Sequence, residues 1–150
     1  MGGLSVLISD QLAKLIILKN FHPGESLPVI KNIFHISPVY NKGIAFGLFA
    51  ERASSIFVWI SYICIIIIVF ILAFYKKFFY KAKSTQIFLS LILAGAVSNL
   101  IDRLRFGFVV DFLDFRIWPV FNIADIAITI GTALLVFQMF KCKLVLNHRP

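Results

Sequence analysis

Two aspartates, Asp111 and Asp125, flank the start of an apolar segment in a chain that is otherwise dominated by hydrophobic residues. An ionised side chain at the centre of a bilayer costs about 2.5–3.5 kcal/mol on insertion scales, so acids at the edge of such a segment indicate a function. Two neighbouring carboxylates cannot both ionise easily and can share one proton. Our first interpretation is therefore an acid pair that activates water for hydrolysis.

The same residues also fit simpler roles. Asn122 could serve only as the N-cap of the following helix, with Asp125 stabilised in the first turn by the helix dipole. Asp111, taken alone, is compatible with an ordinary loop acid. Asp114 fits that class too, either solvated or paired with Arg116. The pattern of residues leaves these alternatives open.

The composition predicts an integral membrane protein with a single domain. The chain has 150 residues, of which 60% are hydrophobic, including 17 Phe, whereas soluble domains contain about 45–50% apolar residues. The net charge of +8 does not indicate nucleic-acid binding, because the basic residues cluster at the ends of apolar segments. The histidines show no metal-binding spacing and the two cysteines lie in or beside apolar runs, so we expect neither a metal nor another cofactor.

Four transmembrane spans are expected, at about residues 4–20, 55–75, 84–103 and 121–141. The run from Ile56 to Tyr75 is uncharged over twenty residues, which is enough to cross a hydrocarbon core of about 30 Å. The first span is the weakest because it contains Asp10 and Lys14. At i, i+4 these two residues lie on one helix face and can pair.

Loop charges predict the orientation of the spans. The Lys-rich loop at about residues 76–83 and the basic C-terminal tail indicate that this loop and both termini are cytoplasmic. The loops at about residues 21–54 and 104–120 then lie on the outer side. Between Val29 and Phe49 the first outer loop is rich in β-branched and aromatic residues and is interrupted by Pro and Gly, which predicts short strands and turns.

Polar residues collect at the outer ends of the last two spans. One helix stripe contains Gly95, Asn99, Asp102 and Arg103, and a second contains Asn122, Asp125 and Thr129. Stripes at matching depth predict a polar cleft between these spans. Adjacent opposite charges near an interface commonly clamp a bundle, so the Asp102–Arg103 pair favours a structural role over a catalytic one.

Five motifs, in this order, resemble the lipoprotein signal peptidase family, signal peptidase II of bacteria. They are Asp10-Gln11-Leu12-Ala13-Lys14, Asn41-Lys42-Gly43-Ile44-Ala45-Phe46, Gly95-Ala96-Val97-Ser98-Asn99-Leu100-Ile101-Asp102-Arg103, Val109-Val110-Asp111-Phe112 and Phe121-Asn122-Ile123-Ala124-Asp125. Ala94 and Ser98 depart from the family pattern, which commonly has Gly at both places; because both residues are small, helix packing is expected to be kept.

The resemblance implies a metal-free aspartyl endopeptidase that cleaves prolipoproteins just before a cysteine carrying diacylglycerol. It implies that the catalytic pair is Asp111 and Asp125. The residues implied to bind substrate or support the oxyanion are Asn41, Asn99, Arg103 and Asn122. The residues implied to be structural supports are Asp10, Lys14, Asp102, Gly43 and Gly95.

The implied fold is an all-α membrane protein: a four-transmembrane-helix bundle with a small β-rich periplasmic cradle and a short periplasmic helix at about Ala45 to Arg52. The implied location is the bacterial inner membrane, with the active site facing the periplasm near the outer leaflet. Expected partners are the lipid-modified prolipoprotein, membrane lipids and the family inhibitor globomycin. The alternative is a small proton-linked transporter, which predicts polar residues spread across the whole membrane depth.

Overall fold

The computed structural model describes residues 2–22, 24–42, 59, 62–63, 65–70, 73 and 83–147. The long helices in this part of the chain are α1 (Gly2–Asn20), α3 (Lys83–Phe106) and α4 (Ile123–Asn147). The strands are β1 (Leu27–Ile30), β2 (Phe34–Asn41) and β3 (Val109–Asp114), which form one antiparallel sheet in the order β1-β2-β3. The fold is therefore mainly helical with a small sheet, as expected.

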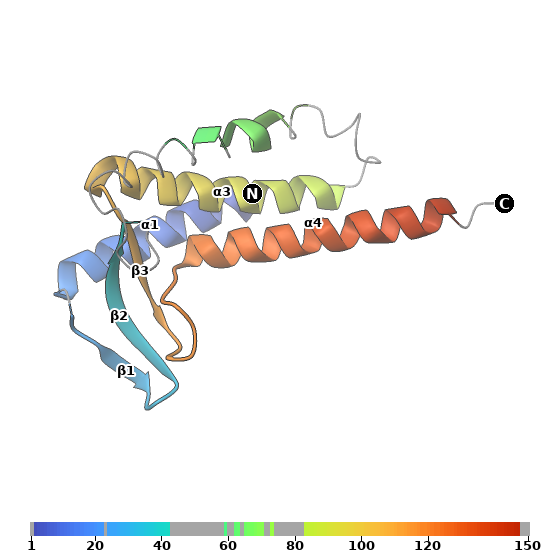
Figure 1. Ribbon diagram of the computed structural model, residues 1–150. Helices are drawn as coiled ribbons and strands as arrows, with labels where there is room; N and C mark the ends of the chain where they lie inside the picture. Colours follow the sequence, from blue (N-terminus) through green and yellow to red (C-terminus); the bar gives the residue numbers. More distant parts are fainter. Residues whose placement is uncertain are drawn as a thin grey trace.

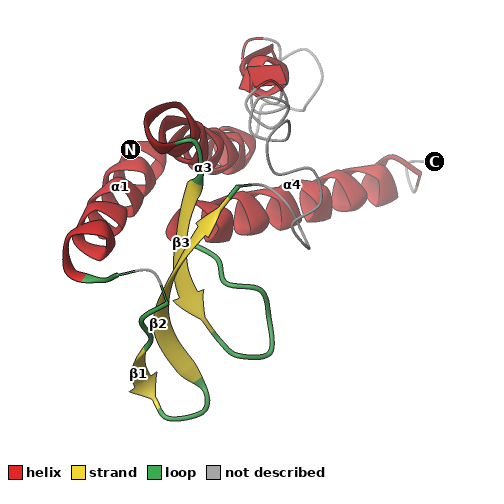
Figure 2. Cartoon of the chain, turned by 60° about the vertical axis from the view of Figure 1, so that its left-hand side comes forward, coloured by secondary structure: helices red, strands yellow, loops and turns green. Residues whose placement is uncertain are grey.

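The sheet extends away from one end of the packed helices (Figure 1), and Figure 2 shows the same separation from another side. Two segments in the described ranges, Ser84–Phe106 and Ile123–Lys141, are long and apolar enough to cross a membrane. The expected span at residues 55–75 and the loop at 76–83 lie largely outside the described residues. Gly43 and the expected short helix at 45–52 lie wholly outside them.

Glycines hold α3 and α4 close together. A Cβ atom added at Gly95 would lie 2.5 Å from the carbonyl oxygen of Ala124, and one at Gly131 would lie 2.8 Å from that of Phe88. Any larger residue at these two positions would force the helices apart. The short distance between the backbones allows short polar side chains to hydrogen-bond directly across the interface.

Helix α3 ends in a left-handed turn that feeds directly into the sheet. Gly107 has a φ of +78° and donates its N–H to the carbonyl oxygen of Arg103 at 3.0 Å. This is the αL cap, which favours glycine because it lacks a Cβ atom. Two residues later β3 begins, and the N–H of Val110 donates to Asp102 Oδ2 at 3.1 Å. The turn thus anchors the strand to the helix that precedes it.

Strand β3 lies in the loop at 104–120, for which the sequence predicted no strand. Val110 and Phe112 are buried and form a core cluster with Ile17 of α1. Both faces of the strand are covered, as its almost continuous burial shows. Its residues therefore do not alternate between apolar and polar, and this alternation is the usual sequence signal of a strand.

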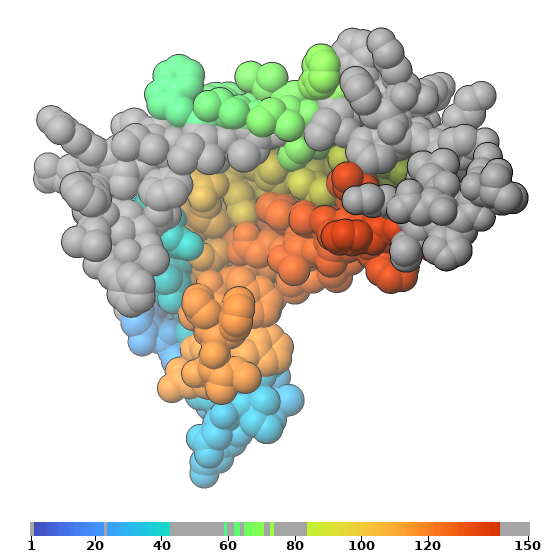
Figure 3. Space-filling view, turned by 45° about the vertical axis from the view of Figure 1, so that its right-hand side comes forward, coloured from blue at the N-terminus to red at the C-terminus, as the bar shows by residue number. Residues whose placement is uncertain are grey.

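Pairing on both sides of β3 brings distant residues together. On one side β2 pairs with it in a register that places Val39 opposite Asp111 and Asn41 opposite Val109. On the other side the chain returns after a short loop, and Leu113 pairs with Phe121. Asn122, the next residue, therefore begins α4 beside the strand. Figure 3 shows the sheet and the β3–α4 loop (orange) projecting beneath the helices.

Candidate active site

Asp111 lies in the middle of β3 with neutral amides as its hydrogen-bond partners. Its side chain is only 2% exposed. Asn41 donates its Nδ2 to Asp111 Oδ2 at 2.9 Å, and Asn122 donates its Nδ2 to Asp111 Oδ1 at 2.6 Å. Asn41 reaches this acid because residues two apart in a strand share a face, and its partner Val109 is two residues from Asp111.

Burial raises the pKa of Asp111 to about 6. The hydrogen bonds from Asn41 and Asn122 and the positive charge of Lys14 lower this pKa, and the negative charge of Asp125 raises it. Burial and the second acid together prevail because amides supply no positive charge. Asp111 is thus an acid that can hold a proton close to neutral pH.

Asp125 occupies the first turn of α4 and caps it. Its N–H donates to Asn122 Oδ1 at 2.9 Å, and the N–H of Asn122 donates to Asp125 Oδ2 at 3.2 Å. This is the reciprocal arrangement of a capping box, in which two otherwise unpaired N–H groups are satisfied. The capping role that the sequence suggested for Asn122 is therefore present. It coexists with the hydrogen bond from Asn122 to Asp111.

Two asparagines connect the acids. Asn99 of α3 donates its Nδ2 to Asp125 Oδ1 at 2.8 Å, and its Oδ1 accepts from Asn122 Nδ2 at 3.1 Å. The path Asp111–Asn122–Asn99–Asp125 therefore joins β3, α3 and α4 by hydrogen bonds alone. The negative charge of Asp125 also acts on Asp111, so the two carboxyl groups interact electrostatically as well as through this path.

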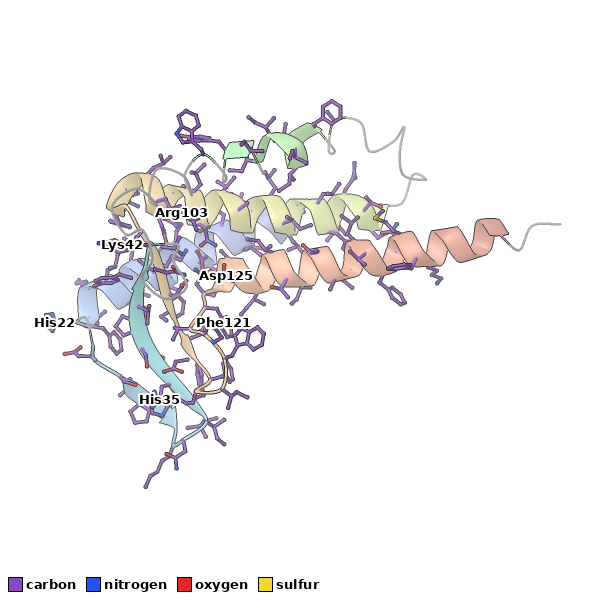
Figure 4. The ribbon with its side chains drawn as sticks, in the orientation of Figure 1. His22, His35, Lys42, Arg103, Phe121 and Asp125 are labelled. Carbon is purple, nitrogen blue, oxygen red and sulfur yellow. The ribbon has the colours of Figure 1, made fainter. Side chains whose placement is uncertain are left out.

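Arg103 lies on the same side of α3 as Asn99, one turn later, and its NH1 donates to the Asn99 carbonyl oxygen at 3.3 Å. The acids that influence its guanidinium most strongly are Asp125 and then Asp111, with Asp102 third. Figure 4 shows Arg103 near the end of α3 and Asp125 at the start of α4, where the sheet joins the helices. The guanidinium therefore interacts electrostatically with both acids of the pair.

A buried ionic cluster formed by Lys14, Asp10 and Asp102 lies beside this site. Lys14 Nζ lies 2.7 Å from Asp10 Oδ2 and 2.8 Å from Asp102 Oδ2, so the pairing expected from the i, i+4 spacing is present. All three residues are at most 1% exposed. Asp10 Oδ1 also accepts the N–H of Ala124 at 2.9 Å, which ties α1 to the start of α4.

Gln11 and Ser98 take part in this cluster although the sequence pattern assigned them no polar role. Gln11 Nε2 donates to Ser98 Oγ at 3.0 Å and to Asp102 Oδ1 at 2.9 Å, and Ser98 Oγ donates to Asp10 Oδ2 at 2.7 Å. The signal that could have identified them is their polarity inside an apolar helix, since a buried polar group requires a partner. The hydroxyl of Ser98 thus does more than keep the residue small.

Asp114 belongs to a different set of contacts. It pairs with Arg116 at 3.1 Å and accepts from Ser37 Oγ at 3.0 Å. Burial alone would raise the pKa of Asp114, but the hydrogen bonds from the Arg116 backbone and guanidinium, together with that from Ser37, hold it below its usual range. Ser37 in turn contacts Ser26, which contacts His35. The Arg116-paired alternative is therefore the one that the structure contains.

A groove of about 330 Å³ opens beside Asp125. Apart from this acid, its lining residues are Trp118, Phe121, Ile126, Thr129 and Ile130. Most of these side chains are apolar, and Trp118 is 70% exposed. Among the described residues no group of His, Cys, Asp or Glu could hold a metal ion. The arrangement offers an acid pair, amide donors and one cation next to an apolar groove, which suits hydrolysis of a bond in an apolar substrate.

Comparison with known proteins agrees with this chemistry. The family model described as signal peptidase (SPase) II matches residues 3–141. This chain belongs to the signal peptidase II family. The peptidase is 49% identical over 137 residues to the lipoprotein signal peptidase of Moorella thermoacetica, covering 91% of this chain and 89% of that protein. It is 44% identical to that of Halothermothrix orenii, covering 92% of each.

Two solved structures of bacterial membrane enzymes share the fold. One has a TM-score of 0.83 and 33% identity, covering 99% of this chain and 91% of the other. The second has a TM-score of 0.81 and 35% identity, covering 93% and 90%. The peptidase is therefore a membrane-embedded enzyme, and the transporter alternative finds no support in these comparisons.

Proposed function

We propose that this peptidase removes the signal peptide of diacylglyceryl-modified prolipoproteins by cleaving just before the lipidated cysteine, with Asp111 and Asp125 as the catalytic pair. Family membership assigns the chain the processing of prolipoproteins by an aspartic peptidase. The single observation that carries the residue assignment is the hydrogen-bonded path from Asp111 through Asn122 and Asn99 to Asp125.

The two acids have different environments, and this difference assigns their roles. Asp111 is buried, and because its pKa is raised to about 6 it carries a proton near neutral pH far more often than an ordinary Asp does. Asp125 is half-buried and lines the groove, and its carboxyl oxygens accept from Asn99 Nδ2 and from the N–H of Asn122. Asp125 therefore takes a proton from water as the water attacks the scissile carbonyl. Protonated Asp111 donates a hydrogen bond to the carbonyl oxygen, and a proton then passes to the leaving amine.

Developing negative charge on the carbonyl oxygen requires further donors. Arg103 offers a positive charge near both acids. Asn41, Asn99 and Asn122 offer amide N–H groups around them, and donors of this kind stabilise an oxyanion. These four residues form the substrate-binding and oxyanion-supporting set. The remaining polar residues, Asp10, Lys14 and Asp102, hold the helices that carry them.

The groove beside Asp125 suits the apolar part of the substrate. Ile126 and Ile130 border it on α4, and both side chains are partly exposed. Each CH₂ group buried there contributes about 0.8 kcal/mol, part of which the bilayer already provides. The lipid of the substrate cysteine therefore mainly sets the depth of the scissile bond. Globomycin, the family inhibitor, is expected to compete for the same surface.

The proposed location is the inner membrane, with both termini cytoplasmic and the site near the outer leaflet. The basic loop and tail support this orientation. Asn99 and Arg103 lie in the last turns of α3 and Asp125 lies in the first turn of α4. The site is therefore at the helix ends that this orientation directs outward. Membrane lipids would surround the apolar helix faces.

The test is incubation of the purified protein with a synthetic precursor peptide whose cysteine carries diacylglycerol, followed by mass measurement of the products. The expected product is a leader fragment that ends just before the modified cysteine. A peptide with an unmodified cysteine is the matched control and should remain intact. Cleavage elsewhere, or equal cleavage of both peptides, would contradict the proposed substrate.

A further inference from the structure

Lys14 touches the amide that connects the acid pair. Its Nζ lies 2.9 Å from Asn99 Oδ1 in addition to its contacts with Asp10 and Asp102. An ammonium group has three N–H donors and no acceptor. With three oxygens as neighbours and a residue exposure of 1%, each donor has a partner. Whatever atom of Asn99 faces Lys14 must therefore be an oxygen.

This contact decides how the Asn99 side chain is turned. An amide has an acceptor oxygen at one end and a donor NH₂ at the other. With Oδ1 held by Lys14, Nδ2 points to Asp125 Oδ1 at 2.8 Å. The reversed amide would place NH₂ against the ammonium and Oδ1 against the carboxylate. Both contacts would then be repulsive.

We propose that Lys14 is a positioning residue for catalysis: by donating to Asn99 Oδ1 it fixes the amide so that Nδ2 donates to Asp125. Lys14 itself touches neither substrate nor water in this role. The inference rests on the proposed function of Asp111 and Asp125 as the catalytic pair. It assigns Lys14 a part in setting the acidity of the pair, beyond joining α1 to α3.

Among the described residues, the charged side chains that act on the pair or its connecting amides lie on α1 and α3. They are Asp10 and Lys14 on α1, and Asp102 and Arg103 on α3, while β2 contributes the neutral Asn41. Replacing Lys14 by a neutral apolar residue removes a positive charge and one of the two donors to Asn99 Oδ1, leaving only Asn122 to hold the amide. Loss of the positive charge makes ionisation of Asp111 less favourable, so the pH dependence shifts to higher pH.

The experiment compares Lys14→Met with Gln11→Met in the full chain, using the diacylglyceryl peptide as substrate. Gln11 provides a matched control, because it makes hydrogen bonds across the same α1–α3 interface without touching Asn99. Lys14→Met is expected to lower kcat about tenfold or more and to move the pH–rate profile up by about one pH unit. Gln11→Met is expected to lower the melting temperature and leave the profile in place.

Lys14→Met leaves Asp10 and Asp102 without their cation, so the double variant Asp10→Asn/Lys14→Met is measured alongside it. The double variant has one fewer unpaired carboxylate and an unchanged net charge, so it is expected to show the lowered kcat with a smaller displacement of the profile. A kcat and a profile like those of the parent in either folded variant, while Asp111→Asn and Asp125→Asn are inactive, overturn the role of Lys14 alone. Normal activity of the two aspartate variants would instead overturn the proposed catalytic pair.

Discussion

Asp111 and Asp114 lie three residues apart in β3, yet their pKa values are shifted in opposite directions from that of an ordinary Asp. Asp111 is bonded to the amides of Asn41 and Asn122, and burial raises its pKa to about 6. Asp114 is less enclosed, at 7% exposed against 2% for Asp111, and the Arg116 backbone and guanidinium are among its donors, so its pKa falls below the usual range. Burial alone therefore does not produce a proton-holding acid. The hydrogen bonds from the Arg116 backbone, the Arg116 guanidinium and Ser37 outweigh the effect of burial on the pKa of Asp114, whereas those from Asn41 and Asn122 do not outweigh it for Asp111.

The largest expected contrast between the two acids is in catalysis. Asp111→Asn is expected to lower kcat about a thousandfold or more, because the shared proton and the coupled pair are lost together. Asp125→Asn is expected to do the same. Cleavage of the diacylglyceryl peptide by purified variants measures both.

Asp114→Asn is the matched control for these variants, since it makes the same chemical change in the same strand. It is expected to retain activity. An inactive Asp114→Asn protein that remains folded would mean that Asp114 takes part in catalysis.

The next effect concerns the amide donors that distinguish Asp111 from Asp114. Asn122→Ala removes a donor to Asp111 and the N-cap of α4. It is expected to reduce kcat about a hundredfold and to lower the free energy of unfolding by about 1 kcal/mol. Kinetic assays and thermal melts of the same preparation separate the two losses. A variant that is less stable but fully active would restrict Asn122 to capping.

A smaller effect is expected in the pH profile of kcat/KM, which reports the free enzyme. Asp111 holds its proton below its pKa of about 6 and loses it above. The descending limb should therefore fall near that pH. Asn41→Leu removes a hydrogen bond that lowers this pKa, so the limb should move to higher pH. A limb that stays in place would mean that another group controls it.

The smallest effect is expected at Asp114. Its pKa is lower in the folded than in the unfolded protein, so it stabilises the fold above its ordinary value of 3.8, and this contribution is lost as the pH falls through the folded pKa. Arg116 is half-exposed, so Arg116→Met should cost less than about 1 kcal/mol at pH 7. Melting temperatures of parent and variant should converge at acidic pH; a constant difference would assign the loss to packing.

The sequence could predict the helical part of this site because its signals are local. The i, i+4 spacing of Asp10 and Lys14 anticipates the ion pair between them, and the stripe with Asn99 and Arg103 anticipates one polar face of α3. Helix periodicity alone is sufficient for such statements. The expected strands of the first outer loop also correspond to β1 and β2.

The sheet contacts could not be predicted in the same way. β3 pairs with β2, which lies far away in the sequence, and its burial on both faces removes the alternation that marks a strand. The different partners of Asp111 and Asp114 follow from this pairing, so their acidities were not visible in the sequence. Nor could it show that Lys14 reaches Asn99, because that contact depends on how closely α1 approaches α3.

The first turn of α4 makes the catalytic geometry depend on the stability of one helix end. The carboxylate oxygens of Asp125 that accept from Asn99 and from the backbone of Asn122 also close the helix end. Helix ends fray before helix centres. Fraying of this turn would separate the acids while the rest of the bundle remains assembled. Thermal inactivation would then precede melting and reverse on cooling.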